Sequence, residues 1–241
     1  MKITLLGVRI DAVGRWEAMR ILTRRMAAGR QTVVYTPNPA MVWRARRDKA
    51  FRAILNRGDL SVADGIGIVL GARLAGLPPP PRVAGIELGG DVLNYAARAG
   101  LRVFLLGGKP RVAQEAARRL VRRFPTLSVC GMHHGYFREG ERDAILHKIR
   151  AARADVLLVC LGSPRQEQWI DRNRAALPSV KLFMGLGGSL DVWAGAVKRA
   201  PRPLRKIGLE WAWRMTLEPR RLKNLAPISA FLVSSLFHGQ S

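Results

Sequence analysis

Apolar and polar positions in this chain form two alternating kinds of segment. Short apolar runs typical of buried strands recur between longer segments with apolar residues at helical spacing. The predicted strands are residues 3–8, 33–36, 60–63, 102–106, 127–131, 156–161 and 180–184. The predicted helices between them are 15–28, 39–55, 65–75, 85–99, 111–124, 141–152 and 165–176. This alternation predicts an α/β fold with a mostly parallel sheet covered by helices on both faces.

The pattern changes near residue 195. Pro201 and Pro203 interrupt the chain, a Trp-containing helix is predicted over 204–215, and basic residues greatly outnumber acidic ones up to residue 224. An apolar stretch over 225–237 follows, too short to span a bilayer. We therefore predict a core domain over 1–197 and a basic, helical, membrane-associating C-terminal appendage over 198–241.

The net charge of +24 is far from ordinary for 241 residues. Such a field attracts nucleic acids, acidic lipids or phosphorylated substrates, and the arginine content suits bidentate phosphate contacts. An overall compositional bias towards Arg and Ala explains the arginines equally well. Charge alone therefore leaves a basic nucleic-acid-binding α/β protein as an alternative.

Cys130 and Cys160 lie inside apolar runs, which predicts buried free thiols and not a disulfide scaffold. The first ten residues do not have the pattern of a signal peptide, and no apolar run reaches the roughly 18 residues needed to span a bilayer. We expect a cytoplasmic protein that lies at a membrane surface.

Polar residues follow two of the predicted strands. Thr36 and Asn38 come after the strand over 33–36, and Asp64 comes directly after the strand over 60–63. Because ligands of parallel sheets bind beyond the carboxyl ends of strands, these residues are candidates for one site. A carboxylate at that edge, Asp64, can act as a base.

Gly107 and Gly108 follow a third strand and precede a helix, so their backbone could hold a phosphate or simply form a tight turn. The spacing to Lys109 is not that of a P-loop. Gly65, Gly67 and Gly71 faintly resemble a dinucleotide-binding pattern, but a carboxylate directly before that turn would repel a pyrophosphate.

Three further polar residues follow strands. Tyr136 could stack on a base or sugar, or pack in its loop. Gln166 could bond a sugar or phosphate, or form a helix-capping box with Ser163 ahead of Pro164. Asp191 could accept a hydrogen bond from a uracil or ribose, or it could be an ordinary acidic residue in the first turn of a helix, where the helix dipole favours a negative charge.

No metal site and no cofactor are predicted. Cys130, His133 and His134 form no complete ligand pattern, and the sequence contains no Asp-x-Asp motif of the kind that many nucleotide-sugar transferases use to hold a divalent ion. If this chain transfers a sugar from a nucleotide, cationic side chains and helix N-termini must neutralise the diphosphate leaving group instead. Arg82 is a candidate for that role, or a solvated loop arginine.

A set of ordered motifs carries a family resemblance. They are Thr36-Pro37-Asn38-Pro39, Ala63-Asp64-Gly65, Arg82 with Gly85, Leu105-Leu106-Gly107-Gly108, His134-Gly135-Tyr136-Phe137, Gly162-Ser163-Pro164-Arg165-Gln166-Glu167, Gly185-Leu186-Gly187-Gly188, and a tail running from Arg199-Ala200-Pro201 to Glu218-Pro219-Arg220-Arg221. Each motif alone is weak, but the ordered set is specific. Over residues 1 to 225 the chain resembles the WecG/TagA/CpsF glycosyltransferases (glycosyltransferase family 26).

The resemblance implies a Rossmann-like core and an inverting transferase. It would move a sugar from a UDP-sugar to a polyprenyl-diphosphate-linked sugar, at the cytoplasmic face of the plasma membrane, in cell-surface polysaccharide biosynthesis. It also implies that the appendage docks on the anionic membrane surface and helps to close the site. The transferred sugar, the pathway and the oligomeric state, a homo-oligomer included, stay open.

The resemblance also implies residue roles. Asp64 corresponds to the general base and Thr36 to its pocket partner, while Asn38, Arg82 and Gln166 line the same pocket. Residues of the appendage, Arg214, Arg220 and Arg221, would meet the acceptor diphosphate or the membrane. Asn224 stands where the family often has a basic residue, a contact that Lys223 could supply instead. A noncatalytic partner in a polysaccharide assembly complex is the third interpretation.

Overall fold

The computed structural model describes residues 1–206, 208, 210–217 and 225–237, with residues 206 and 214–217 described by their backbone alone. The chain divides into two compact units. The first unit consists of Met1–Ala18, Thr36–Gly85 and Lys198–Ser241, and the second of Met19–Tyr35 and Ile86–Val197.

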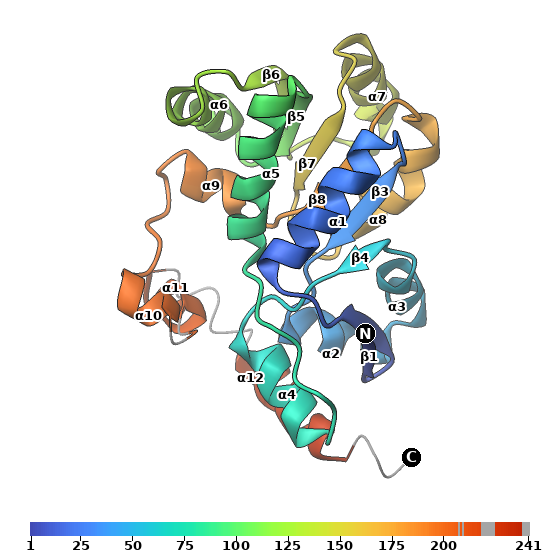
Figure 1. Ribbon diagram of the computed structural model, residues 1–241, viewed down its shortest axis with the longest axis vertical. Helices are drawn as coiled ribbons and strands as arrows, with labels where there is room; N and C mark the ends of the chain where they lie inside the picture. Colours follow the sequence, from blue (N-terminus) through green and yellow to red (C-terminus); the bar gives the residue numbers. More distant parts are fainter. Residues whose placement is uncertain (207, 209, 218–224, 238–241) are drawn as a thin grey trace. The chain divides into compact units, whose positions relative to one another are not determined.

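A six-stranded sheet has the order β4-β3-β8-β7-β5-β6 (Figure 1). Its strands are β3 (Thr32–Tyr35), β4 (Leu60–Ser61), β5 (Arg102–Gly107), β6 (Ser128–His133), β7 (Val156–Cys160) and β8 (Leu182–Gly185). In the second unit the pairs β3–β8, β8–β7, β7–β5 and β5–β6 are all parallel. Every residue of β3, β7 and β8 is buried, as expected of strands covered on both faces. The predicted α/β class is confirmed.

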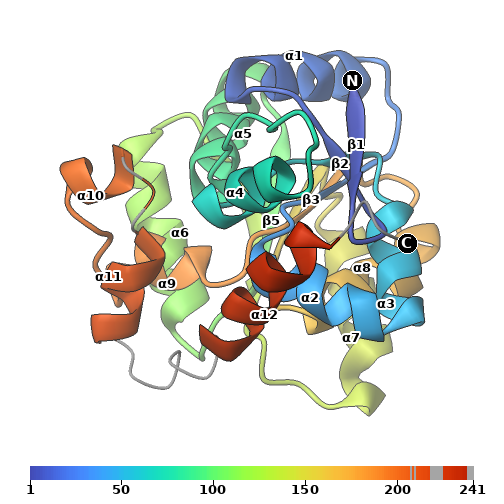
Figure 2. The ribbon, with the colours of Figure 1, turned by 90° about the horizontal axis from the view of Figure 1, so that it is seen from below.

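Helices cover both faces of the sheet in the second unit. Figures 1 and 2 show α5 on one face and α7 and α8 on the other. The helices and 3-10 turns of the second unit are α1 (Arg15–Ala27), α5 (Gly85–Ala99), α6 (Val112–Arg123), η1 (Glu139–Glu141), α7 (Arg142–Ala151), α8 (Arg165–Asn173), η2 (Arg174–Ala176) and α9 (Ser189–Trp193). The first residues of α1 belong to the first unit. Cys130 and Cys160 are both free thiols.

The first unit begins with an antiparallel hairpin, β1 (Lys2–Leu5) and β2 (Val8–Asp11). The single strand predicted over 3–8 is therefore wrong. Leu6 and Gly7 both adopt left-handed backbone conformations, with φ of 48° and 82°, and turn the chain back on itself. A leucine rarely takes that conformation, so the residue pattern did not indicate the turn.

The helix predicted over 39–55 is two helices, α2 (Pro39–Arg47) and α3 (Lys49–Asn56). Asp48 between them is extended, with φ −112° and ψ 95°, and its side chain accepts from the N–H of Phe51. An aspartate that caps a helix in this way starts a new helix instead of continuing the old one.

The helix predicted over 204–215 is likewise two, α10 (Arg202–Lys206) and α11 (Glu210–Leu217), with Gly208 between them at φ 82°. The apolar C-terminal stretch forms α12 (Leu225–Leu236), which lies against α2 and α4 (Ile66–Leu74) in Figure 2. Phe231 of α12 is fully buried and meets the backbone of α4 where Gly71 leaves room for its ring. Among the described helices, none combines the length and apolarity needed to cross a membrane.

Candidate functional site

Asp64 lies in the first unit, in the loop between β4 and α4, and is partly buried. Its N–H donates to the carbonyl oxygen of Pro37 at 2.9 Å. The N–H of Val83 donates to the carbonyl oxygen of Ala63 at 2.9 Å. These two backbone hydrogen bonds bring together three of the segments that the sequence singled out, around residues 36–39, 63–65 and 82–85.

Two glycines allow these segments to approach closely. A Cβ added to Gly67 would lie 2.5 Å from Cγ of Pro39, and one added to Gly85 would lie 3.0 Å from Oγ1 of Thr36. Thr36 is buried, with 7% of its surface exposed. The glycines near Asp64 therefore serve close packing, because larger residues would separate Thr36 and Pro39 from their neighbours.

Asn38 is the N-cap residue of α2, and its Oδ1 accepts from the N–H of Met41 at 3.1 Å. Pro39 follows at the first helical position, as predicted from its fixed φ. Since the cap uses the acceptor oxygen of Asn38, the donor NH₂ of its amide is the group that a ligand could still engage.

Arg82 contacts the appendage within the same unit. Its Nη2 donates to the carbonyl oxygen of Arg205 in α10 at 3.1 Å. Gly208 packs so closely on α4 that an added Cβ would lie 2.7 Å from Cβ of Ile66, two residues after Asp64. The appendage thus touches both the Arg82 and the Asp64 segments, contacts that no local pattern in the sequence indicates.

A partly buried ion pair fixes this part of the appendage. Nε and Nη2 of Arg199 donate to the two carboxylate oxygens of Glu210, at 2.9 and 2.8 Å. Bidentate pairing of this kind is stronger and more directional than a single contact. The pair links the segment before α10 to the first residue of α11. The intervening helix α10, which carries Arg205, is therefore held at both ends.

Gly107 and Gly108 lie in the second unit, where β5 ends beside β7. The N–H of Gly108 donates to the carbonyl oxygen of Cys160 at 3.2 Å, and its own carbonyl accepts from the N–H of Gly135 at 2.8 Å. The following helix α6 begins only at Val112. The Gly108 N–H is therefore used within the fold, and Lys109 and Arg111 are exposed basic side chains in this turn.

Replacing Gly107 with alanine is expected to lower the free energy of unfolding by about 1–3 kcal/mol, the usual cost of a strained backbone conformation. The residue has φ of 136°, and an added Cβ would collide with the carbonyl of Cys160. Denaturant unfolding measures the loss. Gly90→Ala in α5 is the control, because an added Cβ there meets nothing within 4 Å. Equal stability of wild type and Gly107→Ala would contradict the close approach of β5 and β7.

Tyr136 follows β6 in the same region, and 64% of its surface is exposed. The rings of His133 and His134 lie 4.6 Å apart, and that of Phe137 lies 5.9 Å from His133. These neighbours pack against one another and leave the tyrosine ring accessible for stacking.

Gln166 and Glu167, at the start of α8, are buried, with 4% and 1% exposed. Nε2 of Gln166 donates to Oε1 of Glu167 at 2.7 Å, and Oε1 of Gln166 accepts from the N–H of Gly187 at 2.8 Å. The capping box, one interpretation of Ser163 and Gln166, does not form, because the N-cap residue of α8 is Pro164 and makes no side-chain cap. Sequence reasoning missed Glu167, which resembles an ordinary first-turn acid.

Asp191 lies in the first turn of α9, beyond the glycine segment that follows β8. Burial raises the pKa of the Cys160 thiol, at the end of β7, to about 12, and the charge of Asp191 adds to the shift. A Cβ added to Gly108 would lie 3.8 Å from Cβ of Leu190, so the start of α9 lies beside the turn that follows β5. The candidates of the second unit thus follow β5, β6, β7 and β8, the carboxyl ends of parallel strands.

Three candidates lie in the appendage. Arg214 belongs to α11, of which the backbone is described at that position. Arg220 and Arg221 lie outside the described residues, as do Lys223 and Asn224. In the described part of the chain, no group of three or more His, Cys, Asp or Glu side chains is arranged to hold a metal ion.

Comparison with known proteins identifies the family. The family model described as "Glycosyl transferase WecG/TagA/CpsF family" matches residues 3–239. A Bacillus spizizenii protein named N-acetylglucosaminyldiphosphoundecaprenol N-acetyl-beta-D-mannosaminyltransferase is 34% identical over 205 residues, which cover 85% of this chain and 79% of the relative. A Staphylococcus aureus protein of the same name is 33% identical over 233 residues, covering 96% and 91%. The chain therefore belongs to the WecG/TagA/CpsF glycosyltransferase family.

Proposed function

We propose that this protein is an inverting, metal-independent glycosyltransferase with Asp64 as its catalytic base. It takes a sugar from a UDP-sugar and attaches it to a polyprenyl-diphosphate-linked sugar. The observation that carries the proposal is the placement of Asp64 in a loop tied to the Thr36–Pro39 and Arg82 segments. The relatives' names support N-acetylmannosamine as the sugar and an N-acetylglucosaminyl-diphospholipid as the acceptor.

The reaction needs one proton transfer. A hydroxyl oxygen of the acceptor sugar attacks the anomeric carbon of the donor, and its proton passes to the Asp64 carboxylate. The bond from the anomeric carbon to the phosphate oxygen breaks as the new bond forms, and UDP leaves with the bonding electrons. A single in-line displacement inverts the anomeric configuration, so one carboxylate suffices. Thr36 is buried and lies against Gly85, and we propose that it supports the loop that carries Asp64.

The charge that develops on the leaving diphosphate must be neutralised. Arg82 is a candidate because its guanidinium is held at one side by the Arg205 carbonyl, which leaves its other N–H groups for a phosphate. Arg214, Arg220 and Arg221 of the appendage are proposed to meet the diphosphate of the acceptor. Cations placed in this way do the work that a divalent ion does in other transferases.

The second unit is proposed to bind the nucleotide. Tyr136 offers an accessible ring for the uracil or ribose, and Asp191 offers an acceptor for their N–H or O–H groups. The turn at Gly107 and Gly108 brings Lys109 within reach of a phosphate at the same edge of the sheet. Gln166 would donate a hydrogen bond to a sugar or phosphate oxygen.

The appendage is proposed to associate with the anionic inner face of the plasma membrane. On α12, Val233 and Leu236, with Phe237 just beyond its end, are 52–57% exposed, while Phe231 and Ser235 face the protein. Leu70 and Leu74 are also exposed on the neighbouring α4. Exposed apolar side chains beside a basic segment favour the interface of an anionic bilayer, where each basic residue contributes about 1 kcal/mol.

The triple variant Val233→Ser, Leu236→Ser and Phe237→Ser is expected to bind anionic liposomes at least about tenfold more weakly, because each change removes apolar area from the interface. Liposome sedimentation measures the effect. Val121→Ser, an exposed valine on α6, is the control and should bind like wild type. Unchanged binding of the triple variant would refute this membrane surface.

A UDP-release assay tests the enzymatic proposal as a whole. Purified protein is supplied with a series of UDP-sugars and a short polyprenyl-diphosphate N-acetylglucosamine. We expect release that depends on both the donor and the acceptor sugar, with the same lipid lacking its sugar as the control. Failure of every donor would favour the noncatalytic interpretation.

A further inference from the structure

A buried carboxyl group in the second unit has no part in the chemistry described so far. Glu167 is 1% exposed, and burial raises the pKa of its carboxyl, while side-chain hydrogen bonds with Gln166 and Ser163 act in the opposite direction. Burying an ionisable group is costly, so such residues are rare in cores unless they are paired or functional. An apolar residue would serve packing alone better at this position.

The carboxyl of Glu167 determines which way round the Gln166 amide lies. Oε1 of Glu167 accepts from Nε2 of Gln166 at 2.7 Å, and the N–H of Gly187 donates to Oε1 of Gln166 at 2.8 Å. A flipped amide would place its NH₂ against the Gly187 N–H and its oxygen against the carboxyl. Both hydrogen bonds therefore require one orientation, and that orientation leaves the second hydrogen of Nε2 as the free polar group of Gln166.

The amide of Gln166 in turn holds the glycine segment that follows β8. Gly187 has a left-handed backbone with φ of 53°, and a Cβ on Gly185 would lie 3.0 Å from Nε2 of Gln166. Ser189 closes the segment by donating from its hydroxyl to the carbonyl of Leu186 at 2.7 Å. The first turn of α9, with Asp191, follows directly.

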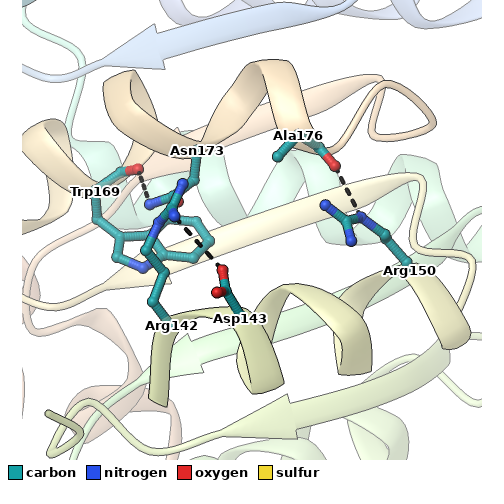
Figure 3. Close-up of polar contacts among 6 residues, drawn as sticks. All are labelled: Arg142, Asp143, Arg150, Trp169, Asn173 and Ala176. Atoms are coloured by element: carbon teal, nitrogen blue, oxygen red, sulfur yellow. Dashed lines mark hydrogen bonds and ion pairs between the residues drawn. The ribbon is translucent and has the colours of Figure 1, made fainter. Parts of the chain in front are cut away.

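Helix α8, which carries both residues, and the η2 turn that follows it are both hydrogen-bonded to α7 (Figure 3). Nε of Arg142 donates to Oδ1 of Asn173 at 2.6 Å, and Nδ2 of Asn173 donates to the carbonyl of Trp169 at 2.7 Å. Nε of Arg150 donates to the carbonyl of Ala176 at 3.0 Å. These contacts hold the C-terminal end of α8, the helix that carries Gln166 and Glu167 in its first turn.

We propose that Glu167 is a positioning residue that fixes the carboxamide of Gln166, and through it the segment 185–188, so that UDP meets an N–H donor on Gln166 and a correctly placed Asp191. The inference rests on the proposed function for the identity of the ligand. Glu167 itself touches no substrate. It acts only through its neighbour, so its effect should vanish when Gln166 is absent.

The test uses two readouts in the full-length protein, amide hydrogen exchange at Gly187 by NMR and the Kd for UDP by calorimetry. Glu167→Leu removes the acceptor, and we expect faster exchange at Gly187 and UDP binding weakened about tenfold, as for the loss of a hydrogen bond to a charged group. Glu167→Gln keeps an acceptor oxygen and should restore both values. Gln168→Leu, one position further along α8, is the control. If Glu167→Leu fails to fold, Glu167→Met makes the same test.

A double-mutant cycle separates positioning from general packing. The pair Gln166→Met with Glu167→Leu should bind UDP no more weakly than Gln166→Met alone. Unchanged exchange at Gly187, unchanged UDP affinity in Glu167→Leu, or additive effects in the cycle would each overturn the proposal. A wild-type protein that binds UDP but transfers no sugar would instead overturn the proposed function, and would leave the role of Glu167 standing.

Discussion

Asp64→Asn is expected to slow sugar transfer by about 10²–10⁴-fold, the range that general-base catalysis supplies. The asparagine side chain has nearly the same shape, so the loop between β4 and α4 should keep its backbone hydrogen bonds to Pro37 and Val83. What the variant loses is the ability to accept the proton of the attacking hydroxyl. Affinity for UDP should therefore be unchanged, and the loss should appear in kcat.

Asp59→Asn is the matched control, because Asp59 lies in the same stretch of chain, is exposed, and belongs to no part of the proposed site. Its kcat should equal that of wild type. Full activity of Asp64→Asn would remove Asp64 from the mechanism. A large loss of UDP affinity in the same variant would place the carboxylate in nucleotide binding and not in proton transfer.

Phe231→Ala is expected to lower the free energy of unfolding by about 3–5 kcal/mol, as for other large aromatic residues deleted from a core. The ring is 0% exposed and packs against the backbone of Gly71, which has no side chain in its way. Contact with α2 adds to this packing. The apolar C-terminal helix thus contributes to the core of the first unit, in addition to any membrane role.

Phe237→Ala is the control for that result, because 57% of Phe237 is exposed. Chemical denaturation should show little change for it, whereas liposome binding should weaken. The two phenylalanines therefore separate the stabilising face of α12 from the face proposed for the membrane. Equal and small losses of stability in both variants would show that α12 is dispensable for the fold. Deleting residues 198–241 would change stability and liposome binding together, and so could not separate these two roles of α12.

Long apolar strands were the most predictable part of the fold. The strand expected over 102–106 is β5 (Arg102–Gly107), and that over 156–161 is β7 (Val156–Cys160). Both are central, and burial on both faces makes them continuously apolar. The order of the strands in the sheet depends on long-range packing and could not be read from residue patterns.

The missed boundaries share a physical cause. Leu6, Asp48 and Gly208 each end an element through their own backbone conformation, inside a stretch whose apolar spacing would allow it to continue. Periodicity reports which residues face the core. It does not report where one residue leaves the helical or extended region of backbone space.

The candidate site was predictable where residues follow strands, and unpredictable where distant segments meet. Asp64 and Gln166 could be singled out by their positions after strands. The contact between Arg82 and the Arg205 carbonyl joins positions 123 residues apart, and neither local pattern indicates it. The importance of Glu167 was hidden because its burial depends on the fold around α8. Membership of the WecG/TagA/CpsF family, predicted from the ordered motifs, is confirmed.

The central claim is that this protein forms a new glycosidic bond with inversion and without a metal. In the most direct test, the protein is incubated with UDP-N-acetylmannosamine and polyprenyl-diphosphate N-acetylglucosamine in the presence of EDTA. The product is identified by mass spectrometry, and its glycosidic linkage is determined by NMR. We predict a lipid-linked disaccharide with a β linkage from the α-linked donor. An α-linked product, or activity that returns only when a divalent ion is added back, would contradict the account.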